Sequence, residues 1–288
     1  MPLSLKTSHR YVQDFFTNTR FVPSRKTVWS RSGTIDVFEM GEGDPILVLP
    51  GMAGGANLLL PFVNELAENY RVFWFDWAGE GHSFALEALR IKDHPTRLLS
   101  DVLDSLPVKS VSVFGISYGG CVALDLAKHG HPGIRHLILT GTPDRLEHAW
   151  ASRLVHRVLT RVPLSSDSAF LNQFFRILLG ESVRDPDLED FVANCIWQTD
   201  QALMARRLDW LLDFDLSQEL TDIQIPTTVL TGDRDIVVPP VCQERLANRL
   251  PNADMHMIAN AGHLGFLSHS KQYLRLLQKT LSQPCSYV

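Results

Sequence analysis

The 288-residue sequence has few cysteines and no long hydrophobic run. Its four cysteines, Cys121, Cys195, Cys242 and Cys285, are scattered without the spacing of a metal site or a CxxC pair. This usage favours reduced thiols over a disulfide framework, and no metal site is predicted. No stretch approaches the roughly 18 unbroken apolar residues of a membrane span.

The sequence also lacks an excess of basic residues and a secretory signal. The formal net charge is −5, so a general nucleic-acid binder is not expected. Residues 1–16 contain no apolar core followed by a small-residue cleavage site. These absences, together with the cysteine usage, predict a cytoplasmic protein. A small-molecule partner is expected from the site residues described below, and the oligomeric state stays open.

What is present is an alternation of short apolar runs and helical patterns. The runs are buried-strand candidates, whereas the intervening segments have apolar residues at helical spacing. The predicted strands are 28–31, 34–40, 45–50, 70–75, 110–114, 134–140, 227–231 and 255–259, and the predicted helices outside the central segment are 58–69, 96–105, 119–129, 241–250 and 269–281. The order predicts an α/β protein, with a mostly parallel central sheet and helices on both faces.

The alternation stops in residues 143–220, where only helical patterns occur. Thr142-Pro143, Ser166 or Ser168, Asp185-Pro186, and Thr199 or Asp200 are the expected starts of four helices. We therefore predict a core of 1–142, with 1–26 as an N-terminal extension, a helical cap over 143–220, and a second core part over 221–288.

One serine stands at a corner between a predicted strand and a predicted helix. The frame Gly115-Ile116-Ser117-Tyr118-Gly119 follows an apolar strand and precedes a helix, so Ser117 would lie at the carboxyl end of the sheet. A serine hydroxyl is a poor nucleophile unless a base removes its proton and donors stabilise the charge on the substrate oxygen. This placement predicts a catalytic serine rather than a plain turn.

Candidate partners follow the last two predicted strands. Asp233 and Asp235 come directly after one strand, and His263 lies in a small-residue loop after the next. The carboxyl ends of parallel strands meet at one edge of a sheet, so these groups should gather near Ser117. His256 lies within a strand pattern and His269 starts the final helix, which leaves His263 as the expected base.

The serine, acid and histidine in this order resemble the α/β-hydrolase superfamily. Two further segments carry the resemblance: residues 49–55, LPGMAGG, are similar to the family's oxyanion loop, and residues 76–83, DWAGEGHS, match its D-x-x-G-x-G-x-S segment. The usual His-Gly pair of the oxyanion loop is Pro50-Gly51 here. The resemblance covers nearly all of the chain outside the helical segment and the first 25 residues.

The resemblance implies roles for individual residues. The family's acid usually stands three residues after the strand-end glycine, which selects Asp235 over Asp233; a minority of the fold places it where this chain has Asp144, an acid better explained by the first turn of a helix. The backbone N–H groups of Met52 and Tyr118 would form the oxyanion hole. Asp76 and His82 would shape the fold, and Glu80 and Glu87 are expected to be solvated.

The predicted cap is rich in tryptophan and phenylalanine. Most of these rings are needed to pack four short helices, but an apolar inner face would also line an acyl or aryl site. The expected substrate-contact residues are Gly51, Trp150, Phe174, Trp197 and Leu264.

The predicted function is hydrolysis of carboxylic esters with small to medium apolar acyl or aryl groups, without metal or organic cofactor. The same groups could cleave a C–C bond beside a carbonyl, hydrolyse a thioester or transfer an acyl group. A ligand-binding protein with little turnover is a further alternative. An epoxide hydrolase or dehalogenase is disfavoured, because those members carry aspartate where Ser117 stands.

Overall fold

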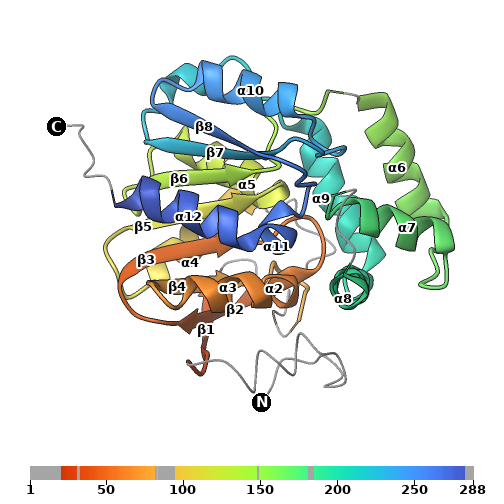
Figure 1. The fold of residues 1–288 in the computed structure, drawn as a ribbon, viewed down its shortest axis with the longest axis horizontal. Coiled ribbons are helices and arrows are strands. Elements are labelled where there is room, and N and C mark those ends of the chain that lie inside the picture. The colour runs from red at the N-terminus through yellow and green to blue at the C-terminus, as the bar shows by residue number, and fades with distance from the viewer. Residues whose placement is uncertain are drawn as a thin grey trace.

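The computed structural model describes residues 21–30, 33–81, 83, 95–147, 149–180 and 185–282. The described residues form an eight-stranded sheet with the order β1-β2-β4-β3-β5-β6-β7-β8 (Figure 1). The β1–β2 and β2–β4 pairs are antiparallel, and all other neighbouring pairs are parallel. The strands are β1 Ser24–Ser30, β2 Gly33–Met40, β3 Asp44–Leu49, β4 Tyr70–Phe75, β5 Val111–Ile116, β6 Ile134–Thr140, β7 Thr227–Gly232 and β8 Ala253–Ile258.

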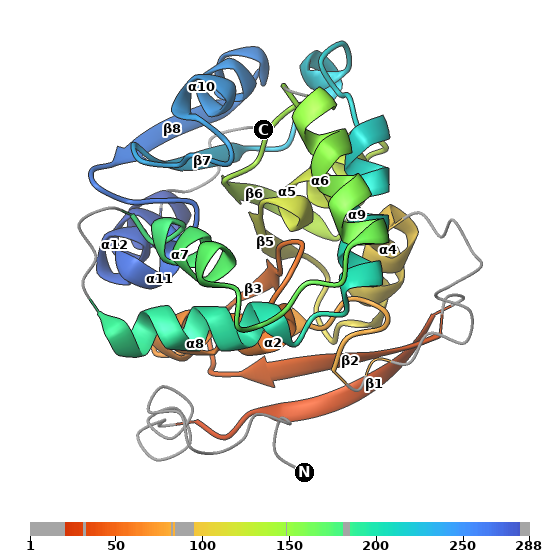
Figure 2. The ribbon, with the colours of Figure 1, turned by 90° about the vertical axis from the view of Figure 1, so that its right-hand side faces the viewer.

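Helices cover both faces of this sheet, which confirms the predicted fold class (Figure 2). Side chains alternate between the faces of a strand, so Ile46 and Val48 pack with α3, α11 and α12, whereas Leu47 and Leu49 pack with α4, α5 and α10. Burial on both faces explains the continuous apolar runs. These helices are α2 Gly55–Leu58, α3 Leu60–Leu66, α4 Pro95–Ser105, α5 Tyr118–Ala127, α10 Pro240–Arg249, α11 Gly265–Ser268 and α12 Ser270–Leu281.

Between β6 and β7, the described part of the chain contains four α-helices and a short 3-10 turn. The four helices gather at one end of the sheet (Figure 1). The side chains of Ser168, Asp185 and Asp200 accept hydrogen bonds from backbone N–H groups at the starts of α7, α8 and α9. Asp185 was predicted, and Ser168 and Asp200 are each one of two predicted alternatives. The elements are α6 Ala149–Arg161, α7 Ala169–Ile177, α8 Pro186–Trp197, α9 Gln201–Asp213 and η1 Leu220–Asp222.

The start of the first of these helices was predicted wrongly. Thr142-Pro143 does not open a helix, because the following residues pair with the segment after α9. The Leu216 N–H donates to the Asp144 carbonyl at 3.0 Å, and Arg145 forms an isolated antiparallel bridge with Asp215. The chain therefore does not enter a helix directly after β6, and α6 begins at Ala149.

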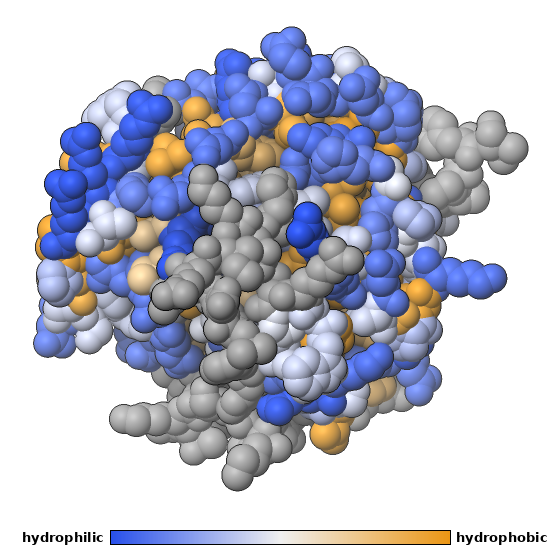
Figure 3. All heavy atoms as spheres, turned by 180° about the vertical axis from the view of Figure 1, so that it is seen from behind, coloured by the Kyte–Doolittle hydropathy of each residue, from blue (hydrophilic) through white to orange (hydrophobic). Residues whose placement is uncertain are grey.

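The face turned away from the viewer in Figure 1 is mainly hydrophilic where its residues are described, with smaller hydrophobic areas between (Figure 3). No helix in the described ranges is long and apolar enough to cross a membrane. Cys121, Cys195 and Cys242 are buried free thiols, and Cys285 lies outside the described residues.

Candidate functional site

Ser117 occupies a strained backbone corner between β5 and α5. Its φ and ψ are +52° and −116°, an unusual conformation for a residue with a side chain. The flanking glycines permit the corner: a Cβ at Gly115 would lie 2.6 Å from the Gly120 Cα, and one at Gly119 would lie 2.6 Å from the Pro50 carbonyl oxygen. The strand, the helix and the segment that contains Pro50 therefore approach more closely than larger residues would allow.

His263 and Asp235 are joined by a buried hydrogen bond. The distance from His263 Nδ1 to Asp235 Oδ2 is 2.9 Å. Asp235 Oδ1 accepts hydrogen bonds from the Val237 and Val238 N–H groups at 2.9 and 2.8 Å, which fixes the carboxylate. With Nδ1–H donating to this carboxylate, a neutral His263 carries its free lone pair on Nε2 and can accept a proton there.

The end of β6 connects the serine corner to this pair. The Ser117 N–H donates to the Thr140 carbonyl at 2.9 Å. The next residue, Gly141, has φ +57°, and a Cβ on it would lie 2.7 Å from His263 Cε1 and 3.4 Å from Asp235 Oδ2. Ser117, Asp235 and His263 thus follow β5, β7 and β8 and lie at the same edge of the sheet, around the end of β6.

The two other candidate acids have different partners. Asp233 Oδ1 accepts the Asn260 N–H at 2.6 Å and so holds the loop before His263. Asp144 is buried and accepts from Arg245, with Nε at 3.1 Å from both carboxylate oxygens. Arg245 also pairs with Glu147. Asp144 is therefore an ion-pair partner, and its predicted place in the first turn of a helix was wrong.

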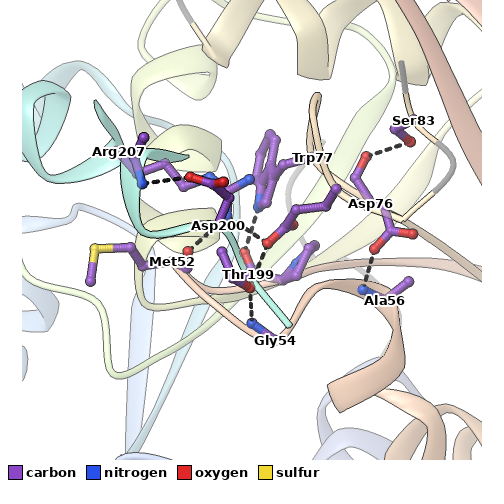
Figure 4. Close-up of polar contacts among 12 residues, drawn as sticks. Met52, Gly54, Ala56, Asp76, Trp77, Ser83, Thr199, Asp200 and Arg207 are labelled. Carbon is purple, nitrogen blue, oxygen red and sulfur yellow. Dashed lines mark hydrogen bonds and ion pairs between the residues drawn. The ribbon is translucent and has the colours of Figure 1, made fainter. Parts of the chain in front are cut away.

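The predicted oxyanion loop, residues 49–55, begins at the end of β3 and is held from one side by the segment after β4. Trp77 Nε1–H donates to the Pro50 carbonyl at 3.0 Å, and the Ala56 N–H donates to Asp76 Oδ1 at 2.6 Å. Burial raises the pKa of Asp76 to about 7, although the bond from Ala56 opposes this shift. The Asp76 carbonyl accepts from Ser83 Oγ (Figure 4). The segment therefore supports the loop, in agreement with the predicted structural role of Asp76.

From the other side the loop is held by the helical segment. Arg207 Nη1–H on α9 donates to the Met52 carbonyl at 2.7 Å, and Thr199 Oγ1 accepts the Gly54 N–H at 2.9 Å (Figure 4). Glu80 Oε1 accepts from both Arg207 Nη1 and Thr199 Oγ1, at 2.9 and 2.8 Å.

Glu80 was predicted to be solvated, and this was wrong. Its side chain is 5% exposed and that of Arg207 is 7% exposed, because each carries the counter-charge of the other. Sequence reasoning missed Arg207, although it lies on the apolar stripe of α9 that buries Met204, Leu208 and Leu211. His82 and Glu87 lie outside the described residues.

Tyr118, the second predicted oxyanion donor, is the first residue of α5. The first N–H groups of a helix have no acceptor within the helix, so the Tyr118 N–H needs an acceptor from outside α5. Its ring is buried between Trp77 and Trp210, at centroid distances of 5.2 and 5.6 Å. Trp210 therefore brings α9 against the helix that begins beside Ser117.

The five predicted substrate-contact residues have different environments. A Cβ on Gly51 would lie 3.8 Å from Ser117 Cβ, so this backbone borders the serine. Leu264 is buried after His263. Trp197 packs on Phe175 within the helical segment, with Nε1–H donating to Asn172. Two further predicted rings are more open to solvent: those of Trp150 (72% exposed) and Phe174 (37% exposed).

No cluster of three or more His, Cys, Asp or Glu side chains in the described ranges could hold a metal ion.

Comparison with known proteins relates this chain to one family of hydrolases. Residues 44–270 match the family model described as alpha/beta hydrolase fold. A proline iminopeptidase of Lactobacillus crispatus is 25% identical over 274 residues, 84% of this chain and 91% of that protein. A poly(3-hydroxyalkanoate) depolymerase of Ectopseudomonas oleovorans is 28% identical over 262 residues, 83% of this chain and 84% of that protein.

Among solved structures, an esterase from Exiguobacterium antarcticum shares the fold. Its TM-score is 0.80 at 21% identity, over 90% of this chain and all of that one. The relatives are named for different substrates, so the class of hydrolase does not follow from them. The family-model match over residues 44–270 identifies this chain as a member of the alpha/beta hydrolase fold family, and together with the hydrolytic relatives it identifies the chain as a hydrolase.

Proposed function

We propose that the protein is a serine hydrolase that cleaves carboxylic esters with small to medium apolar acyl or aryl groups. The observation that carries the proposal is the strained Ser117, placed at the same sheet edge as the buried His263–Asp235 hydrogen bond. Strain at one residue is maintained when the surrounding structure requires it, and such residues concentrate at active sites.

In the proposed mechanism, Ser117 Oγ attacks the ester carbonyl while His263 Nε2 removes its proton. Asp235 holds the imidazole and stabilises its protonated form. The N–H groups of Met52 and Tyr118 would stabilise the negative charge on the carbonyl oxygen. His263 then donates the proton to the leaving alkoxide, and water, deprotonated by the same imidazole, releases the acid from Ser117.

Two observations favour an ester substrate with an apolar acyl group. The aromatic rings of Trp77, Tyr118 and Trp210 pack against one another where α5 begins, so the side chains packed beside the serine corner on this side are apolar. A relative named as a depolymerase of a polyhydroxyalkanoate and a structural neighbour named as an esterase are compatible with ester cleavage. Thioester hydrolysis, C–C cleavage and acyl transfer would use the same three residues.

The test is a panel of p-nitrophenyl esters from acetate to dodecanoate, with proline p-nitroanilide as a peptidase substrate. We expect ester turnover that falls by roughly 10⁴- to 10⁶-fold in Ser117→Ala, with the variant still folded. Turnover of the anilide in preference to every ester would contradict the ester assignment. More than a tenth of wild-type activity in Ser117→Ala would contradict the nucleophile.

A further inference from the structure

The contacts of Arg207, Glu80 and Thr199 converge on the loop that carries the proposed oxyanion donor. Arg207 binds the carbonyl of Met52, the residue whose N–H would face the oxyanion. Thr199 binds the N–H of Gly54, two residues further on. The carbonyl of one peptide and the N–H of a nearby one are therefore fixed from α9 and from the turn before it (Figure 4).

The geometry of the ion pair indicates that it serves the loop. Arg207 Nη1 is shared between Glu80 Oε1 and the Met52 carbonyl, while Arg207 Nη2 and Glu80 Oε2 are buried without a partner in the described part of the chain. A pair that maximised its own stability would be bidentate, with two parallel hydrogen bonds. Here one contact to the carboxylate is combined with one contact to the loop.

We propose that Arg207, with Glu80 and Thr199, is a positioning unit through which the helical segment orders the oxyanion loop for catalysis. Arg207 acts through the Met52 backbone and does not itself contact the reacting atoms. This inference rests on the proposed function and deepens it. The physical basis is that oxyanion donors act only when they are already aimed at the position that the charge will occupy.

A merely structural role predicts a different result from a positioning role. Loss of a positioning contact lowers kcat and leaves KM nearly unchanged, because the oxyanion forms only in the transition state. Loss of a structural contact lowers the melting temperature and leaves kcat of the folded fraction unchanged. The two roles are separable in one set of variants.

The experiment uses Thr199→Val, which removes the hydroxyl at nearly constant volume, and Arg207→Lys, which keeps the charge. Thr199→Ser is the conservative rescue. The matched control is Thr160→Val, because the Thr160 hydroxyl donates to carbonyls of its own helix α6. For each variant, kcat and KM are measured with the best p-nitrophenyl ester, together with inhibition by an alkyl trifluoromethyl ketone, whose adduct with serine carries an oxyanion.

We expect kcat to fall about 10- to 100-fold in Arg207→Lys and about 10-fold in Thr199→Val, with KM within about threefold, since removal of a whole oxyanion donor costs roughly 10²- to 10³-fold. The trifluoromethyl ketone should weaken by the same factor as kcat/KM, and Thr199→Ser should recover most of the loss. If Arg207→Lys does not fold, Thr199→Val with its rescue decides alone. Values of kcat within twofold of Thr160→Val would overturn the inference while wild-type activity still supported the proposed function. An inactive wild type that takes no fluorophosphonate label would overturn both.

Discussion

A single methyl group added at Gly141 tests the arrangement of the candidate site without removing any of its functional groups. In Gly141→Ala the new Cβ would lie 2.7 Å from His263 Cε1 and 2.8 Å from His263 Nδ1. Ordinary carbon contacts begin near 3.4 Å. The imidazole must therefore move by about 0.7 Å, which disturbs its hydrogen bond to Asp235 and its place at the sheet edge.

The expected loss of activity follows from that displacement. A misplacement of about 1 Å costs on the order of 10²-fold in rate, so we expect kcat to fall between 10- and 100-fold. The backbone contributes a separate effect, because φ at Gly141 is +57° and an L-residue in this region loses roughly 1–2 kcal/mol of stability. Stability and activity must therefore be measured independently.

Gly130→Ala is the matched control. Gly130 also has a positive φ, +71°, but a Cβ there meets nothing within 4 Å. Both variants should lose a similar amount of stability in urea unfolding, and only Gly141→Ala should lose ester turnover and react slowly with a fluorophosphonate. Equal reaction rates for the two folded variants would refute the placement of His263 against Gly141 as a requirement for activity.

Three further predictions follow from the structure. Asp235→Asn should lower kcat by roughly 10³- to 10⁴-fold, since the imidazole loses its charge partner. Asp144→Asn should lower the melting temperature and keep the rate of reaction with a fluorophosphonate. The reverse pattern would place the catalytic acid after β6. Because burial raises the folded-state pKa of Asp76 to about 7 from 3.8, its contribution should lower the free energy of unfolding by up to about 4 kcal/mol as pH rises from about 4 to 7. Asp76→Asn should remove that fall, measured as the difference between the unfolding free energies of wild type and variant at each pH. Burial lowers the pKa of His136 to about 4, so this histidine changes the stability in the opposite direction, but it does so in both proteins and cancels in the difference. Parallel stability curves for wild type and variant would contradict the role of Asp76. Each methylene of a buried acyl chain should raise kcat/KM about threefold to fourfold until the site is full, and a preference for acetate over hexanoate would argue against an apolar site.

The sheet, its helices and the edge that collects Ser117, Asp235 and His263 could be predicted because their signals are local. A buried parallel strand is a short apolar run, and the residue after it lies at the carboxyl edge whatever the rest of the chain does. The starts of α7, α8 and α9 were predictable for the same reason, since a capping side chain acts within three residues.

The errors concern residues whose environment depends on distant partners. Glu80 is buried because Arg207 lies against it, a pairing across 127 positions that no local pattern reveals. Asp144 was assigned to a helix start, but Leu216 and Arg245 hold it in the irregular connection before α6. For the segment 76–83, the predicted structural role of Asp76 was therefore correct and the predicted environment of Glu80 was wrong.

The central claim is that Ser117 is an activated nucleophile, and covalent labelling tests it most directly. The native protein is treated with a fluorophosphonate, and the adduct is located by peptide mass spectrometry, with Ser117→Ala, His263→Ala and urea-unfolded wild type in parallel. The account predicts one adduct per chain, on Ser117, formed quickly only by the native wild-type protein. An unlabelled native protein, or an adduct on another residue that persists in Ser117→Ala, would contradict it.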